Sequence, residues 1–145
     1  MEIRKPNDNE LEQIMLLSPQ ALFDGTLGEV KPTNEKIKQL IKPLLKKGCY
    51  YLIAIEDEKL LGWVLIGATK DQFTDKTVGF IYELFVREEF RGKGFSKQLM
   101  KSAINHLKLE GYSEIRLSAF VNNHAINLYE KMGFNTRNVT MSLKL

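Results

Sequence analysis

The chain of 145 residues is 43% hydrophobic and 27% charged, a composition typical of one globular domain, which we expect to span residues 1–145. Its 21 basic and 18 acidic residues leave a net charge of +3, which is too small to indicate a nucleic-acid-binding protein. The single cysteine, Cys49, excludes an internal disulfide and a cysteine-rich metal site, and the longest apolar run, residues 60–68, is too short to cross a membrane.

The N-terminal part of the chain predicts a short strand and then a helix. Residues 2–5 form the strand, and Asn7 or Asp8 is suited to cap a helix that ends at about Leu17. Residues 18–32 contain two prolines and two glycines, so we expect them to be irregular.

A second helix and a series of alternating elements follow. Thr33 is suited to cap this helix, Gly48 to end it, and Pro43 to kink or break it early. The later elements are read from stretches of β-branched and aromatic residues and from apolar residues at helical spacing. We expect strands over residues 49–56, 60–69, 78–87, 114–121 and from 134 onward with a turn or final hairpin, and helices over 93–110 and 123–132.

The order of these elements indicates a mixed sheet. Some strands follow one another directly and others are joined by helices, so we expect helices on both faces of the sheet. The strand over 78–87, the helix over 93–110 and the strand over 114–121 form one crossover unit. Such crossovers are right-handed, and these two strands should therefore be parallel.

The turn between that strand and that helix reads Arg91-Gly92-Lys93-Gly94-Phe95-Ser96. Its glycines allow the backbone to approach a ligand closely, and the start of the helix offers free N–H groups and a positive dipole end. Two basic side chains add charge, so the turn suits a pyrophosphate. It lacks the spacing of a Walker loop and the third glycine of the dinucleotide fingerprint. The alternative interpretation of these residues is a tight strand-to-helix turn with basic side chains on the surface.

A second segment runs from Asn122 to Phe134 and contains Tyr129 beside an apolar helical stripe. As structure, Tyr129 is a partly buried aromatic residue. As chemistry, its phenol can donate a proton to a departing anion.

Together the two segments resemble the GNAT N-acetyltransferase superfamily. The turn is similar to the family's Arg/Gln-x-x-Gly-x-Gly/Ala motif, with Ser96 where glycine or alanine is usual. The later segment matches the family's Asn-x-x-Ala-x-x-Leu-Tyr-x-x-x-Gly-Phe pattern at every position, through Asn122, Ala125, Leu128, Tyr129, Gly133 and Phe134. The resemblance implies an α/β (α+β) fold with a mixed, mostly antiparallel sheet of six to seven strands, splayed between residues 78–87 and 114–121.

The resemblance also implies acetyl-CoA as acetyl donor and assigns residues to it. The pantetheine arm would bond main-chain groups on the strand before the turn, the turn would hold the pyrophosphate, and Asn122 would bond the arm. These cofactor-binding residues are Leu84, Phe85, Val86, Arg91, Gly92, Lys93, Gly94, Phe95, Ser96 and Asn122.

Two residues are the catalytic candidates. Tyr129 would protonate or hydrogen-bond the leaving thiolate. Glu83 would act as the base for the amine, directly or through water. If Glu83 faces away from the cleft, Tyr82 takes its place. His124, at a helix start, is a lesser candidate.

We therefore expect a cytoplasmic N-acetyltransferase that acts by direct attack in a ternary complex. The alternatives are a non-catalytic acyl-CoA-binding regulatory module on the same fold and a nucleic-acid binder that uses the lysines over residues 36–47. The acceptor is a small-molecule amine or a protein or peptide N-terminus, with residues 18–35 and 134–140 as its wall. We expect no nucleic acid, membrane or metal as a partner. The sequence does not decide between a monomer and a homodimer.

Overall fold

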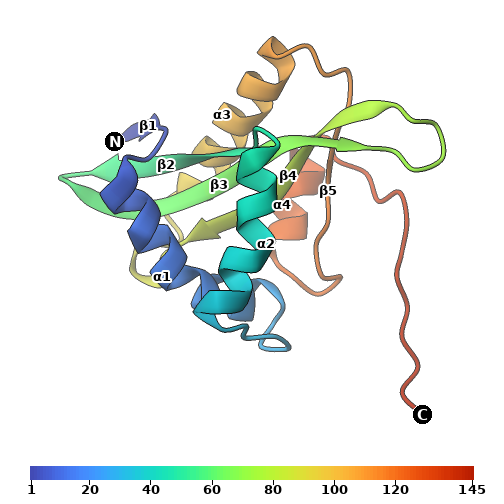
Figure 1. The fold of residues 1–145 in the computed structure, drawn as a ribbon, viewed down its shortest axis with the longest axis horizontal. Coiled ribbons are helices and arrows are strands. Elements are labelled where there is room, and N and C mark those ends of the chain that lie inside the picture. Colours follow the sequence, from blue (N-terminus) through green and yellow to red (C-terminus); the bar gives the residue numbers. More distant parts are fainter.

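The computed structural model describes residues 1–145 as a five-stranded sheet with helices on both faces (Figure 1). The elements follow the chain in the order β1 (Glu2–Arg4), α1 (Asp8–Gly25), α2 (Asn34–Lys46), β2 (Tyr50–Glu56), β3 (Lys59–Lys70), β4 (Thr77–Val86), a 3₁₀ turn η1 (Glu88–Phe90), α3 (Phe95–Leu109), β5 (Ile115–Leu117) and α4 (Ala125–Lys131). None of the helices is long and apolar enough to span a bilayer.

The strands lie in the sheet in their order along the chain, β1 to β5. All neighbours are antiparallel except β4 and β5, which α3 connects and which are parallel. The predicted mixed, mostly antiparallel sheet with helices on both faces is confirmed. The predicted number of strands is too high, because residues 135–145 form no strand.

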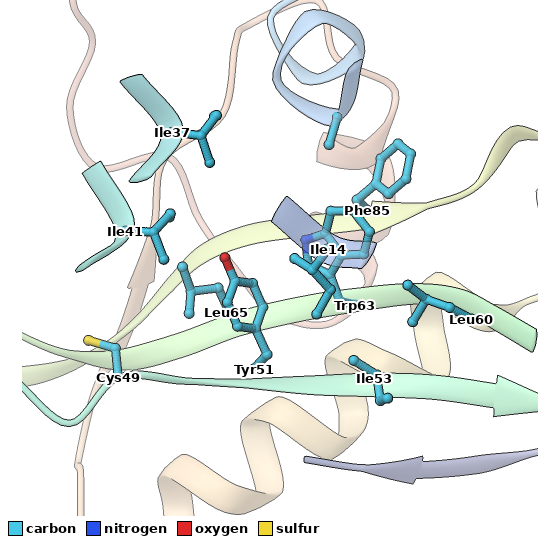
Figure 2. Packing of buried hydrophobic residues seen from close by; sticks show 11 residues of the cluster. Ile14, Ile37, Ile41, Cys49, Tyr51, Ile53, Leu60, Trp63, Leu65 and Phe85 are labelled. Carbon is cyan, nitrogen blue, oxygen red and sulfur yellow. The ribbon is translucent and has the colours of Figure 1, made fainter. Parts of the chain in front are cut away.

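Two apolar clusters hold the helices on the sheet. The first lies under α1 and α2 and centres on Trp63 and Tyr51 of the middle strands (Figure 2). The second lies under α3, where Leu99, Met100 and Leu107 are fully buried. The sheet therefore has two different faces, one covered by the first two helices and the other by the last two.

Two predictions that involve prolines differ from the structure: residues 18–25, which were expected to be irregular, belong to α1, and Pro43, which was expected to kink its helix or break it early, lies inside α2. α1 continues through Pro19 to Gly25, and α2 continues through Pro43 to Lys46. In α1 the buried residues Ile14, Ser18 and Ala21 keep helical spacing on both sides of the proline. Packing of this face outweighs the lost backbone hydrogen bond, which costs about 3 kcal/mol in an unsupported helix.

The strand predicted over residues 114–121 is much shorter, because β5 covers only Ile115–Leu117. The residues after it are exposed, with Val121 82% accessible. β5 is also the last strand of the sheet, so its outer edge has no neighbour to extend the pairing.

Candidate functional site

A β-bulge in β4 decides which side chains face α1 and α2. The register of β3 and β4 pairs Leu65 with Glu83 and Ile66 with Ile81, so Tyr82 is an extra residue. Tyr82 packs against the cluster under α1 and α2, and the Glu83 side chain reaches Trp63 of that same cluster. Glu83 therefore faces the α1–α2 side together with Tyr82, and not in alternation with it.

The Glu83 carboxylate lies in an apolar setting with one strong hydrogen bond. It accepts a hydrogen bond of 2.6 Å from the indole N–H of Trp63. Burial raises the pKa of Glu83 to about 7, and the hydrogen bond from Trp63 opposes this rise. A carboxylate with a pKa near neutrality can both take up and release a proton, which suits a general base.

Two neighbours of Glu83 could not be identified from the sequence. Trp63 and Tyr51 belong to no motif in the sequence and lie in the strands expected over residues 60–69 and 49–56. The Tyr51 hydroxyl is buried with no hydrogen-bond partner, and Figure 2 shows it pointing from the sheet toward α2. Burial, and secondarily the charge of Glu83, raises the pKa of Tyr51. An unpaired hydroxyl and a carboxylate thus lie under α1 and α2.

The pairing of β4 with β5 stops halfway along β4. It joins Gly79, Phe80 and Ile81 to β5 and goes no further. Because the Arg87 N–H bonds to Leu61 of β3, and main-chain groups alternate along a strand, the groups of Leu84 and Val86 point away from β3. The main chain of Phe85 faces Trp63 in the ladder. Of the three residues expected to bond a pantetheine arm, Leu84 and Val86 have the suitable orientation.

The turn before α3 presents a row of free donors. None of the backbone N–H groups from Gly92 to Lys97 has an acceptor within the chain. Gly92 and Gly94 have φ angles of 78° and 83°, and a Cβ placed on either would meet nothing within 4 Å. α3 begins at Phe95 with no capping side chain. This open row of N–H groups at a helix start fits the pyrophosphate of a coenzyme A thioester.

Arg91 has structural partners. Its Nε donates to the Val86 carbonyl at 2.8 Å, and its guanidinium bonds Asp24 of α1 at 2.9 Å. The arginine therefore ties the end of β4 and the end of α1 to the turn. A phosphate at the turn would meet mainly backbone N–H groups and Lys93, with Arg91 holding the loop in place.

Replacing Gly94 with alanine is expected to raise the KM for acetyl-CoA, the donor that the resemblance implies, about tenfold. An alanine in this left-handed conformation costs about 1 kcal/mol and disturbs the row of N–H groups. Gly111, at the other end of α3, has a similar φ of 96° and open space around it. The Gly111→Ala variant should lose similar stability in thermal unfolding and keep its KM. Equal KM values for both variants would contradict a binding role for the turn.

Tyr129 lies on the other face of the sheet. It belongs to α4, is partly buried against the cluster under α3, and packs edge-on to Phe134 with ring centroids 6.1 Å apart. Burial raises the pKa of Tyr129, so its phenol stays protonated at neutral pH. No group within the chain bonds its hydroxyl. His124 is exposed at the start of α4 and makes no capping hydrogen bond.

A cavity of about 410 Å³ lies between two loops. Its walls are residues 26–29, from the connection of α1 to α2, and residues 120–122, from the connection of β5 to α4. Asn122 is one of its lining residues. The amide of Asn123 donates to the Gly25 carbonyl at 3.1 Å and so joins the two loops. Glu29 carries the only carboxylate in the lining and has no ion-pair partner.

The two catalytic candidates are therefore on opposite faces of the sheet. Glu83 faces the α1–α2 side, and Tyr129 packs on the α3–α4 side. The two faces meet where β4 loses β5 as its neighbour.

Comparison with known proteins gives one consistent result. Residues 16–134 match the family model described as Acetyltransferase (GNAT) family. The chain is 30% identical over 115 residues to the uncharacterized N-acetyltransferase YycN of Bacillus subtilis, covering 74% of this chain and 72% of that protein. It is 35% identical over 91 residues to the spermine/spermidine N(1)-acetyltransferase of the same organism, covering 60% and 57%. Its fold is similar to that of a putative acetyl transferase from Pyrococcus furiosus, with a TM-score of 0.82, 24% identity and 99% of each chain covered.

Proposed function

The chain belongs to the acetyltransferase (GNAT) family and is an acetyl-transferring enzyme that takes its acetyl group from acetyl-CoA. On this premise we propose that it transfers the group to a primary amine by direct attack, with Glu83 as base and Tyr129 as acid. The proposal is supported by Glu83 facing the α1–α2 side and Tyr129 packing on the α3–α4 side of a sheet in which β4 has no neighbour on its β5 side beyond Ile81.

The chain binds the donor mainly through its backbone. The N–H groups from Gly92 to Ser96 bond the pyrophosphate, with Lys93 as counter-charge. The main-chain groups of Leu84 and the N–H of Val86, which face away from β3, bond the pantetheine arm as a strand bonds its neighbour. One of these N–H groups polarises the thioester carbonyl. Asn122, which lines the cavity between the two loops, bonds the arm as well.

The chemistry balances with two proton transfers. The amine nitrogen bonds to the carbonyl carbon of the thioester, and the bond between that carbon and sulfur breaks. Glu83, directly or through water, takes the proton that a cationic amine must lose before its nitrogen can attack, and the second proton, which the nitrogen loses as the amide forms, goes to the departing sulfur or to solvent. Tyr129 donates its hydroxyl hydrogen bond, or its proton, to the leaving thiolate. A thiol pKa of about 8.5 and a phenol pKa of about 10 make stabilisation by hydrogen bonding the larger part of this role.

We propose that the acceptor enters through the cavity between residues 26–29 and 120–122. Asp24 is engaged by Arg91, which leaves Glu29 as the carboxylate that can attract a cationic amine there. Phe120 and Val121 of the same wall suit an apolar portion next to the amine. A primary amine with one positive charge and an apolar neighbour fits this lining better than a long polycation.

The test is a thiol-release assay with acetyl-CoA and a panel of acceptors. The panel contains a simple aliphatic amine, an aralkyl amine, spermidine, an aminoglycoside and a short peptide with a free N-terminus. Thiol release that depends on an amine, with the acetylated product seen by mass spectrometry, is the expected result. Acetyl-CoA binding in calorimetry without turnover of any acceptor would favour the non-catalytic acyl-CoA-binding module.

A further inference from the structure

Trp63 is the only tryptophan of the chain, and its ring is fixed in the core. Its side chain is 0% exposed. In the sheet it lies between Ile53 of β2 and Phe85 of β4, and its ring packs against that of Phe85 with centroids 4.7 Å apart (Figure 2). The indole cannot turn without disturbing this packing, so the direction of its N–H is set by the core.

A buried indole N–H needs an acceptor, and here the acceptor is a carboxylate. Trp63 pairs with Phe85 in the ladder and Leu65 pairs with Glu83, so Trp63 and Glu83 are diagonal neighbours on one face of the sheet. The indole Nε1 donates to Oε1 of Glu83 at 2.6 Å. That distance is short for an N–H donor, as expected when the acceptor is ionised. The bond joins a rigid core ring to the proposed base.

The two oxygens of the Glu83 carboxylate are not equivalent. Oε1 accepts the hydrogen bond from Trp63, and Oε2 makes no hydrogen bond or ion pair within the chain. The Glu83 side chain is only half-buried, so the carboxylate is not sealed off from a ligand or from water. With one oxygen held by a fixed donor, the other oxygen is presented in a single direction.

The charges on the elements around Glu83 are either exposed or paired. All ionisable side chains of α2 are exposed. On α1 and β5, the charged side chains that are not exposed are ion-paired: Glu10 with Arg4, Asp24 with Arg91, and Arg116 with Asp71 and Glu114. The other titratable groups on this face carry no charge when protonated, and they belong to Cys49, Tyr51 and Tyr82. Trp63 is therefore the one polar side chain that bonds the Glu83 carboxylate.

We propose that Trp63 is a positioning residue for the base: its indole N–H holds Oε1 of Glu83, so that Oε2 is the atom that takes the proton of the acceptor amine. This inference rests on the proposed function, because it requires Glu83 to be the base. The proton passes from the cationic amine to Oε2, directly or through water, and the indole keeps its own hydrogen throughout. The N–H also favours the ionised carboxylate, which is the form that can accept a proton.

Replacing Trp63 with phenylalanine should lower kcat about tenfold and leave the KM for acetyl-CoA unchanged, because the donor does not contact the indole. Burial raises the pKa of Glu83 to about 7 and the indole N–H opposes the rise, so its loss should move the acidic limb of the pH profile upward by about one pH unit. If Trp63→Phe does not fold, the single tryptophan is replaced biosynthetically by benzothienylalanine, in which sulfur takes the place of the N–H.

Ile53→Val is the matched control. Ile53 is fully buried and pairs with Trp63 across β2 and β3, so this variant loosens the packing of the ring and leaves its N–H in place. It should unfold at a lower temperature than wild type and keep the acidic limb near pH 7. An acidic limb at the same pH in wild type and in the protein without the indole N–H would overturn the positioning role.

The fluorescence of the chain gives a second test, which needs no substrate. The indole emission comes from Trp63 alone, and it should change with a midpoint near pH 7 as Glu83 ionises. The Glu83→Gln protein should show no such change between pH 5.5 and 9. The same emission profile in wild type and Glu83→Gln would overturn the role of Trp63 and leave the proposed function in place. An emission change that depends on Glu83, without turnover of any amine, would overturn the proposed function and support the pairing.

Discussion

Replacing Tyr129 with phenylalanine should lower kcat about 100-fold and leave the KM for acetyl-CoA nearly unchanged. The ring stays in its partly buried place beside Phe134, so the fold is preserved. The hydroxyl, which no group in the chain bonds and which burial keeps protonated through its raised pKa, is lost. Its loss affects the departure of the thiolate and not the binding of the donor. Steady-state kinetics with the best amine of the panel measures both constants.

Tyr112 offers the matched control for this variant. It is also a tyrosine partly buried against the cluster under α3, but it precedes β5 and lies outside the motif around α4. Tyr112→Phe should keep wild-type kcat. A Tyr129→Phe enzyme with full activity on every acceptor would remove Tyr129 from the mechanism, whatever its position.

Replacing Glu83 with glutamine should lower kcat/KM about 100-fold at pH 8 and change the pH profile. Because the pKa of Glu83 is raised to about 7, the wild-type carboxylate becomes available as a base only as the pH rises through that value. The wild-type profile should therefore have an acidic limb near pH 7. The variant should lose this limb and keep only the dependence that belongs to the amine. Activity measured from pH 5.5 to 9 tests this.

Thermal unfolding of the same variant separates catalysis from structure. The usual pKa of a glutamate is 4.5 and that of Glu83 is about 7, so the folded protein binds a proton more tightly than the unfolded chain. Stability then falls as the pH rises through this interval. The glutamine variant should lose this fall and have a higher Tm than wild type at pH 8. An unchanged pH profile together with the altered Tm would limit Glu83 to a structural role.

Local sequence patterns predicted most of the architecture. Glycines and basic residues at 91–96 indicated a turn that starts a helix, and the turn has that form, with Gly92 and Gly94 at positive φ. The crossover rule predicted the parallel pair of β4 and β5, which the sheet contains. These features depend on residues that are close together in the sequence. Local sequence patterns are therefore enough to predict them.

Features that depend on distant residues could not be read in the same way. The bulge at Tyr82 depends on its register with β3, and the hydrogen bond of Glu83 depends on Trp63, twenty residues away. Arg91 carries a family motif, yet its partners are the Val86 carbonyl and Asp24. Asp24 is 67 residues away from Arg91 in the sequence. No sequence pattern indicates that this arginine, which is suited to bind phosphate, forms an ion pair with a carboxylate of the first helix.

The bulge in β4 has an evolutionary consequence. On the proposed mechanism, the main chain of Leu84 and Val86 handles the donor, and side chains on the opposite face, with Glu83 among them, handle the acceptor. Main-chain groups are the same whatever the residue, so mutation can alter the acceptor wall while donor recognition persists. Acceptor preference is thus free to drift between relatives whose donor is fixed, and libraries randomised at Glu29, Phe120 and Val121 are a direct way to redirect the enzyme toward other amines.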